Sequence, residues 1–372
     1  MRITRHATSA GLLPGFVRFT AEVREANKAD GPIWIDVPEA IEPEVVDRLD
    51  AWLLWVLPYA FETQQEVTLD GPVDHELLRN AHEFMEIWSR WKPGRRPVRI
   101  RADSDHAPQR QGERTGVFFS AGVDSFFTLF HHDAMGREHP EWRQRPIDDL
   151  VYVEGFDIPL EHRAALDAKR AALERIATET GKTPVTFATN LRETGVRRPW
   201  GPEMHGPALG GAGLLAGRRW GTMLLSAGTC YEDIEPPWGS TGITDPLLST
   251  SATGTRLYGA GHDRFEKLEF LREFPLALDE LHVCWEDRSE RNCGRCEKCL
   301  RTLLTLEVLG VRERATTFPR GSFDLGRLVE SWKGKPINVR IYRHLMRHAE
   351  RAGRMDIAAA IAGHLESAPP SA

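Results

Sequence analysis

The sequence has little of what secreted, membrane and nucleic-acid-binding proteins rely on. Only five cysteines occur in 372 residues, and the net charge is −6, so no overall basic field would attract nucleic acid. The longest apolar stretch, residues 51–61, is broken by Pro58 and is shorter than the roughly 20 residues of a membrane-spanning helix. The N-terminal residues show no apolar signal segment. We therefore expect a cytoplasmic protein that binds neither membrane nor nucleic acid.

Four of the five cysteines are clustered in one short segment. Gaps of eight, two and two residues separate Cys284, Cys293, Cys296 and Cys299. A two-residue gap lets two thiols reach one ion from a tight turn, and Gly294 gives that turn its backbone freedom. Disulfides or free core cysteines are the alternatives, but neighbouring thiols in a cytosolic chain favour a metal. The spacing predicts a structural Zn²⁺ site with four thiolate ligands.

A strand, a loop of small residues and a helix are predicted over residues 116–130. Residues 116–119 are apolar, residues 120–125 read SAGVDS, and helical apolar spacing follows. This arrangement presents backbone N–H groups and a positive helix end to an anion. Ser120 and Ser125 would add hydroxyl donors to phosphate oxygens, and Asp124 would hold a phosphate-bound Mg²⁺. An ordinary strand–helix turn with capping side chains is the alternative.

Both motifs together carry a specific resemblance. SAGVDS resembles the SGGxDS pyrophosphate loop of the PP-loop ATP pyrophosphatases, with Ala121 in place of the first glycine. The cysteine run, continued to Arg301, resembles the zinc motif of the 7-cyano-7-deazaguanine synthase branch of that family. The resemblance covers roughly residues 114–310. It implies that ATP contacts the loop residues Ser120, Ala121, Gly122, Val123, Asp124 and Ser125.

Regular alternation of strands and helices from residue 116 predicts an α/β fold with a doubly wound parallel sheet. Further strands are expected at 149–157, 184–190, 222–228, 255–261 and 281–287. Ligands of such sheets bind at the carboxyl ends of the strands, which adds Gly155, Phe156, Asp157 and Gly228 to the predicted ATP site. We predict an N-terminal α+β domain over 1–108, the ATP-binding domain over 114–312 and a C-terminal helical extension over 313–372. Residues 101–116 are the best linker candidate.

The segment after the fourth predicted strand, residues 230–251, is a long loop of the kind that binds ligands. In the 7-cyano-7-deazaguanine synthases this region carries an acid and a segment that recognise the deazaguanine base. Asp233 matches that acid, and residues 239–246 match the segment in part, without its tyrosine-proline portion. An acidic solvated loop is the alternative. The candidate substrate-binding residues are Glu232, Asp233, Trp238 and Asp245.

Basic groups are needed to neutralise charge when ATP is cleaved, and Lys298 and Arg301 follow the cysteine cluster. With Asp124 and Ser125 they are the candidate catalytic residues. His205 and Cys230 are interpreted as structural.

The resemblance implies an enzyme that adenylates a deazapurine-type carboxylate with ATP and Mg²⁺, releases pyrophosphate, and forms an amide or nitrile with a nitrogen nucleophile. One alternative is a relative from antiphage defence that joins the adenylated acid to a protein acceptor. Another is a non-catalytic nucleotide-binding module. Formation of a homodimer stays open.

Overall fold

The computed structural model describes residues 1–25, 29–107, 111–234, 236–286, 291–320, 325–326 and 339–367. Within these residues the chain forms an α/β fold with one eleven-stranded mixed sheet and ten α-helices. The strands are β1 (Arg2–Arg5), β2 (Ser9–Ala10), β3 (Phe16–Arg24), β4 (Ala29–Pro38), β5 (Val67–Asp74), β6 (Ile100–Asp105), β7 (Arg114–Phe118), β8 (Asp149–Glu154), β9 (Thr183–Thr189), β10 (Trp220–Ser226) and β11 (Gly254–Tyr258).

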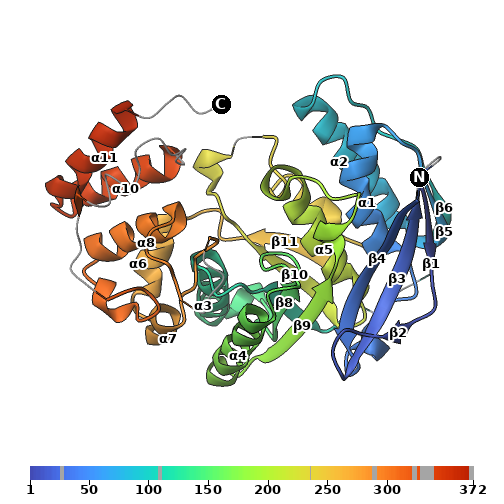
Figure 1. The fold of residues 1–372 in the computed structure, drawn as a ribbon, viewed down its shortest axis with the longest axis horizontal. Helices are drawn as coiled ribbons and strands as arrows, with labels where there is room; N and C mark the ends of the chain where they lie inside the picture. Colours follow the sequence, from blue (N-terminus) through green and yellow to red (C-terminus); the bar gives the residue numbers. More distant parts are fainter. Residues whose placement is uncertain are drawn as a thin grey trace.

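The helices connect these strands and continue beyond the last one. They are α1 (Asp50–Thr63), α2 (His75–Trp91), α3 (Val123–Glu138), α4 (Arg163–Thr180), α5 (His205–Leu215), α6 (Arg264–Leu271), α7 (Pro275–Asp279), α8 (Glu297–Val308), α10 (Val339–Arg351) and α11 (Met355–Ser367). Figure 1 shows α10 and α11 at one end of the molecule, beside α6 and α8, and the N-terminal strands at the other end.

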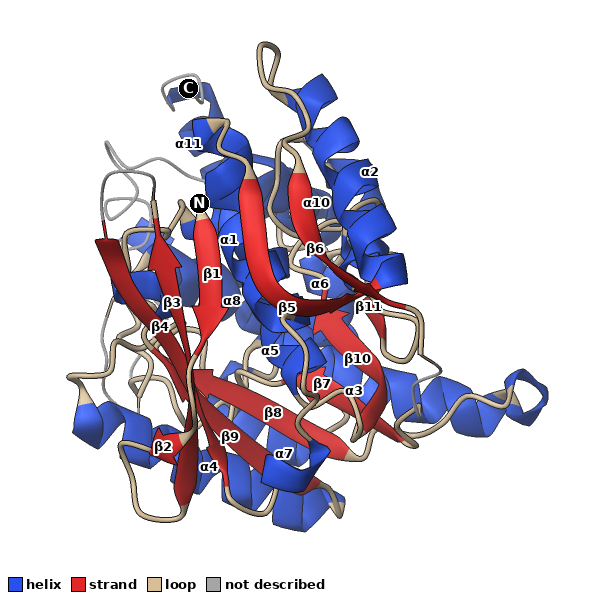
Figure 2. Cartoon of the chain, turned by 90° about the vertical axis from the view of Figure 1, so that its right-hand side faces the viewer, coloured by secondary structure: helices blue, strands red, loops and turns tan. Residues whose placement is uncertain are grey.

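The sheet has a parallel part and a mixed part. Strands β11, β10, β7, β8 and β9 lie side by side in that order and are all parallel. They correspond to the strands predicted at 255–261, 222–228, 116–119, 149–157 and 184–190. Beyond β9 the order continues β4, β3, β1, β5 and β6, with β2 on β3, and the β9–β4 pair is antiparallel. Figure 2 shows both parts of this sheet.

The parallel strands are buried on both faces. Leu150 and Tyr152 of β8 belong to one hydrophobic cluster, which also contains residues of α3, α4 and α8. Val151 and Val153 point the other way, into a second cluster that contains residues of α1, α2 and α5. Successive side chains of a strand alternate between faces, so the parallel strands separate two apolar layers. A third cluster joins α10 and α11 to α6 and α8.

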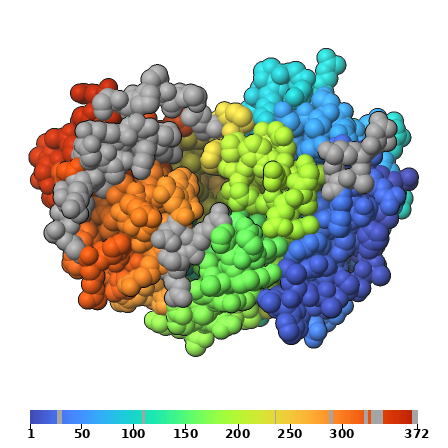
Figure 3. Space-filling model, viewed as in Figure 1, coloured from blue at the N-terminus to red at the C-terminus, as the bar shows by residue number. Residues whose placement is uncertain are grey.

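The sheet runs without a break from the segment predicted as the N-terminal domain into the segment predicted to bind ATP, through the pairing of Ile35 and Asp36 with Thr189 and Ala188. The division into three domains therefore stays a prediction. Part of the predicted linker is strand, because β6 extends to Asp105 and β7 begins at Arg114, while 108–110 lie outside the described residues. Figure 3 shows N-terminal and C-terminal residues at opposite ends of the molecule.

One predicted strand is wrong. Residues 281–286 carry no strand, and residue 287 lies outside the described residues. Backbone N–H groups of this segment donate elsewhere, since His282 donates to the carbonyl of Ala121 and Val283 donates to the Asn292 side chain. None of the described helices combines the length and the apolar character that crossing a bilayer requires.

Candidate functional site

The loop between β7 and α3 is held in a tight turn. Ala121 has a φ of 56°, a left-handed conformation that costs a residue with a Cβ roughly 1 kcal/mol more than glycine. Its carbonyl accepts a hydrogen bond from His282 N at 2.8 Å. The Ser125 hydroxyl donates to the Gly122 carbonyl at 3.1 Å, and Gly122 is the N-cap of α3. The predicted loop residues therefore lie at the start of α3, a helix of sixteen residues. The first backbone N–H groups of a helix have no acceptor within that helix.

Asp124, in the first turn of α3, is held between two cations from α6. Lys267 Nζ lies 3.0 Å from its Oδ1, and Arg264 Nη1 lies 3.1 Å from its Oδ2. Lys267 also donates to the Ala227 carbonyl at 2.6 Å, just past the end of β10. Burial alone would raise the pKa of Asp124, but the Lys267 ammonium and the Arg264 guanidinium outweigh burial and lower the pKa to about 2. Asp124 is therefore ionised and already paired at neutral pH.

Further cations surround this pair. Burial lowers the pKa of Lys298, on α8, and the nearby acids Asp157 and Asp124 oppose that shift. Burial likewise lowers the pKa of Arg301, where Asp124 again opposes. Lys169, on α4, donates to the Ser120 carbonyl at 2.5 Å, and burial lowers its pKa to about 8.

Two donors of this cationic cluster lack hydrogen-bond partners. In the described part of the chain, the buried Nε atoms of Arg264 and Arg301 find no acceptor. The Nη1 of Arg301 is paired with Glu297 at 3.2 Å. Buried guanidinium donors without acceptors are costly, and an anion in this region would supply the acceptors.

The predicted ATP-site residues at the carboxyl ends of β8 and β10 differ in conformation and exposure. Gly155 follows β8 with a φ of 89°, and a Cβ at this position would lie 2.0 Å from the Thr189 carbonyl oxygen. Phe156 is buried, whereas Asp157 is exposed and lies within electrostatic reach of Lys169 and Lys298. Gly228, after β10, is exposed, with open space where a Cβ would be.

The rings of Phe156, Trp200 and His205 lie next to one another and form an aromatic wall. The ring centroid of Trp200 lies 4.9 Å from that of Phe156 and 5.4 Å from that of His205. The Arg192 guanidinium lies 4.9 Å from the Trp200 ring centroid. Burial lowers the pKa of His205, while Asp157 opposes that shift. The wall is therefore close enough to Asp157 to interact with it, and flat aromatic faces of this kind suit a heterocyclic base.

The four predicted substrate-binding residues do not converge. Glu232 and Asp233 lie in a short 3-10 turn (Tyr231–Asp233) beside α10, where His344 Nε2 is 2.9 Å from Asp233 Oδ2. Trp238 packs over Gly201. Asp245 is fully buried and accepts hydrogen bonds from Ser240 Oγ at 2.7 Å and Thr241 N at 3.1 Å. These contacts make Asp245 an internal support of residues 240–245. Glu235 lies outside the described residues.

The four clustered cysteines come together as the spacing predicts. Their sulfurs all lie within 4.8 Å of one another, with 3.9 Å between Cys284 and Cys296 and 3.9 Å between Cys293 and Cys299. Sulfurs at about 2.3 Å from a tetrahedral ion would be about 3.8 Å apart, so this group could hold a metal ion. Backbone N–H groups of Arg295 and Cys296 point at Cys293 Sγ, at 3.4 and 3.2 Å.

Asn292 organises this cysteine cluster, and no sequence signal singled it out. Its buried side-chain oxygen accepts from the backbone N–H groups of Val283 at 2.8 Å and Cys284 at 3.0 Å. Its amide nitrogen donates to the Leu281 carbonyl at 2.8 Å and to Thr317 Oγ1 at 2.9 Å. Asn292 thereby fixes Cys284 against the other three cysteines, which follow it in the chain.

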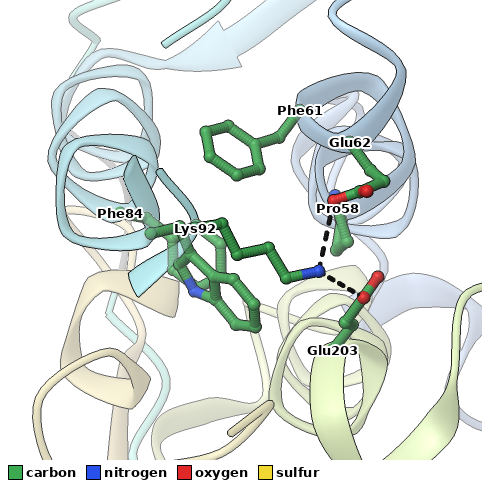
Figure 4. A pocket seen from close by; sticks show the side chains of 7 residues that line it. Pro58, Phe61, Glu62, Phe84, Lys92 and Glu203 are labelled. Carbon is green, nitrogen blue, oxygen red and sulfur yellow. Dashed lines mark hydrogen bonds and ion pairs between the residues drawn. The ribbon is translucent and has the colours of Figure 1, made fainter. Parts of the chain in front are cut away.

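A small cavity between α1 and α2 is not a ligand site. Its lining residues include Phe61, Glu62, Trp88, Lys92 and Glu203, and its volume is about 10 Å³, which is at most space for one water molecule. Lys92 Nζ lies 3.2 Å from Glu62 and 2.5 Å from Glu203, as Figure 4 shows. These ion pairs join α1 and α2 to the turn before α5, so the cavity belongs to an internal contact.

Sequence reasoning missed Arg264, Lys267 and Lys169 as members of the cationic cluster. Arg264 and Lys267 lie on the charged helix after β11, and their spacing of three residues places both on one helix face. Comparisons with family models, with curated proteins and with solved structures found no match to this chain.

Proposed function

We propose that this chain is an ATP-dependent enzyme that adenylates a carboxylate and transfers the acyl group to a nitrogen nucleophile. The observation that carries the proposal is the cationic cluster at the start of α3. Lys169, Arg264, Lys267, Lys298 and Arg301 lie within electrostatic reach of Asp124, Asp157 or both, while Glu280 also reaches Lys169 and Glu297 pairs with Arg301. Five cations and four acids leave an excess of one positive charge, and the Nε atoms of Arg264 and Arg301 would gain acceptors from a bound phosphate.

The loop residues would bind the leaving pyrophosphate. The first N–H groups of α3, which have no acceptor within the helix, and the Ser120 hydroxyl of the same loop would suit phosphate oxygens. Asp124 would be the residue to hold Mg²⁺ when nucleotide binds, and Lys267 and Arg264, which it now pairs with, would then be able to bind the phosphates. The two cations are thus kept in place by an internal anion until an external one arrives, so little reorganisation is needed during the reaction.

The reaction would follow from this placement. A substrate carboxylate oxygen attacks the α-phosphorus of ATP, the bond to the bridging oxygen breaks, and pyrophosphate leaves. The nitrogen nucleophile then attacks the acyl carbon and AMP leaves. Lys298 and Arg301 would stabilise the charge that develops at the α-phosphate, and the partly exposed rings of Trp200 and His205, backed by the buried Phe156, would receive a base. The four-cysteine cluster would hold Zn²⁺ and fix the start of α8, on which both Lys298 and Arg301 lie.

The carboxylate class follows from the resemblance of the two motifs to the 7-cyano-7-deazaguanine synthase branch, and one observation favours a second candidate. Asp233, the residue matched to base recognition, is bound to His344 and its backbone carbonyl accepts from Arg340 at 2.7 Å. An acid engaged in this way is less available to a deazaguanine base. A different acid, joined to a protein acceptor, is therefore the alternative substrate pair.

The test is exchange of labelled pyrophosphate into ATP, because exchange requires the adenylation step alone and no acceptor. With Mg²⁺ and 7-carboxy-7-deazaguanine we expect exchange, with AMP accumulating after ammonium is added. Lys298→Met should reduce exchange at least 100-fold. Arg79→Met, which removes an exposed cation on α2, is the matched control and should leave exchange unchanged.

The outcomes separate the candidates. Exchange without amide or nitrile formation would favour a protein acceptor. ATP binding without exchange, for this acid and for a panel of other aromatic carboxylates, would contradict the enzymatic proposal and favour a nucleotide-binding module.

A further inference from the structure

A second group of metal-ligating side chains lies where the C-terminal helices meet the loop after β10. Cys230, Glu232 and Asp233 come from the loop, and His344 comes from α10. Cys230, Glu232 and His344 border a hollow of about 360 Å³ that is also lined by residues of the α6 N-terminus. Cys230 and His344 are buried, whereas the Glu232 side chain is 66% exposed. The group is separate from the four-cysteine cluster and does not depend on the proposed function.

The donor atoms are spaced as metal ligands are. Cys230 Sγ, a Glu232 oxygen and a His344 nitrogen lie within 4.8 Å of one another. Asp233 Oδ2 lies beside two of these donors, 3.4 Å from Cys230 Sγ and 2.9 Å from His344 Nε2. Ligands about 2.0–2.3 Å from a tetrahedral ion are about 3.3–3.8 Å apart, so small side-chain movements would complete the shell.

The chemistry of the donors selects the kind of metal. One thiolate, one imidazole and two carboxylates are the mixed sulfur, nitrogen and oxygen set that suits Zn²⁺ and excludes Mg²⁺ and Ca²⁺, which prefer oxygen ligands throughout. We propose that Cys230, Glu232, Asp233 and His344 bind a divalent transition metal of the Zn²⁺ class, which fastens α10 to the loop after β10.

The second ring nitrogen of His344 faces a fixed carboxylate. Asp263 Oδ2 lies 3.2 Å from His344 Nδ1 and 2.9 Å from His348 Nε2. Asp263 is the N-cap of α6, and its side chain is held by a hydrogen bond that it accepts from Glu266 N at 2.9 Å. A carboxylate behind a histidine ligand orients the ring and leaves its other nitrogen for the metal. Arg347 Nη2 also lies 2.5 Å from His344 Nδ1. On metal binding, this half-exposed guanidinium would move to Glu232 or into solvent.

A neighbouring group is less suited to a metal. Asp263, Glu266 and His348 also lie within 4.8 Å of one another. However, the two acids form a reciprocal capping box at the start of α6, so one oxygen of each is already used by a backbone N–H group. Asp263 therefore supports His344, and the metal lies on the Cys230 side.

The metal would also fix the start of the long loop, residues 230–251, that the sequence predicts to bind substrate. Cys230 follows Ala227 by three residues, and the Ala227 carbonyl accepts the hydrogen bond from Lys267. A metal between Cys230 and α10 would therefore fix the loop start at one side of the cationic cluster. The ion pair between Asp233 and His344 would be replaced by two bonds to one ion.

The test is metal content of the full chain, measured by elemental mass spectrometry after growth with zinc and removal of loosely bound metal on a chelating resin. We expect two zinc ions per chain in the unaltered protein. Cys230→Ala and His344→Ala should each retain one, and Cys296→Ser, which alters the four-cysteine cluster, should also retain one. His348→Ala is the matched control on the same helix and should retain two.

Affinity gives a second readout. Asp263→Asn keeps the N-cap oxygen but removes the carboxylate, so Co²⁺ titration should show about 10–100-fold weaker binding at the second site only. In the His344→Ala protein, the zinc ion that remains in the four-cysteine cluster, and unchanged thermal melting of the region that holds this cluster, show that the chain is folded. One zinc ion per chain in the unaltered protein, with no second site for Co²⁺, would overturn the proposal. Equal metal content in His344→Ala and the unaltered protein would also overturn it.

Discussion

Asp124→Asn tests whether the carboxylate of the β7–α3 loop serves as the internal partner of the cationic cluster. The substitution keeps the size of the side chain and removes its charge. Lys267, only 2% exposed, then retains the Ala227 carbonyl as its acceptor, and Arg264 loses an ion pair. We expect a loss of stability at neutral pH, because two buried cations lose the anion that offsets their burial.

The magnitude follows from the pKa of the carboxyl. Burial opposes ionisation, but Lys267 and Arg264 lower the pKa of Asp124 from 3.8 to about 2, which corresponds to roughly 2.5 kcal/mol of stability in the ionised state. A depressed pKa contributes stability that is present above 3.8 and is lost as the pH falls towards 2. Asp124→Asn should therefore cost about 2.5 kcal/mol at pH 7 and about half of that at pH 3.

Urea denaturation of both proteins at several pH values between 3 and 7 measures this difference. Asp356→Asn is the control, because it removes an acid from an ion pair with Arg354 in which Asp356 is 54% exposed. We expect the control to change stability by less than about 0.5 kcal/mol. A difference for Asp124→Asn that is below this value at pH 7, or that is as large at pH 3 as at pH 7, would refute the reasoning.

Three further predictions concern other parts of the molecule. Cys296→Ser should remove one metal ion and lower the melting temperature, and an unchanged metal content would contradict the four-cysteine site. Gly155→Ala should destabilise by at least about 3 kcal/mol in thermal denaturation, because its Cβ would lie 2.0 Å from the Thr189 carbonyl oxygen; an unchanged melting temperature would exclude this clash. Burial raises the pKa of Asp245 to about 7, so stability should fall as the pH rises from 4 to above 7, by up to about 4 kcal/mol. Asp245→Asn should flatten that profile, and an equally steep profile would show that another group titrates.

The parallel strands could be predicted because they are buried on both faces. Strands such as β8 are continuous apolar runs, and the polar turns between them mark their ends. The N-terminal strands give a weaker signal, because β3 alternates buried with half-exposed residues and β1 has a single buried residue. The strand predicted at 281–287 shows the opposite error. There Leu281 and Val283 belong to the hydrophobic cluster that also contains Cys296 and Cys299, and the Asn292 side chain accepts from the N–H groups that a neighbouring strand would need.

The site was predictable where it depends on one short segment. The cysteine cluster follows from spacing alone, and the structure brings its four sulfurs together. The pairing of Asp124 with Arg264 and Lys267 crosses about 140 residues of sequence, so nothing local could reveal it. Asp245 shows a related limit. From the sequence, an acid in a loop is expected to be exposed, but in the structure Asp245 is buried and accepts a hydrogen bond from the Ser240 hydroxyl.

The first turn of α6 connects the two sites that we propose. Asp263, its N-cap, contacts His344 and His348 of α10, and the next residue, Arg264, contacts Asp124. Lys267, one turn later, contacts Asp124 and the end of β10. A helical turn is rigid, so a movement of α10 that displaces Asp263 also displaces the cations that face the β7–α3 loop. The position of the C-terminal helices and the charge around Asp124 are therefore set by the same eight-residue helix.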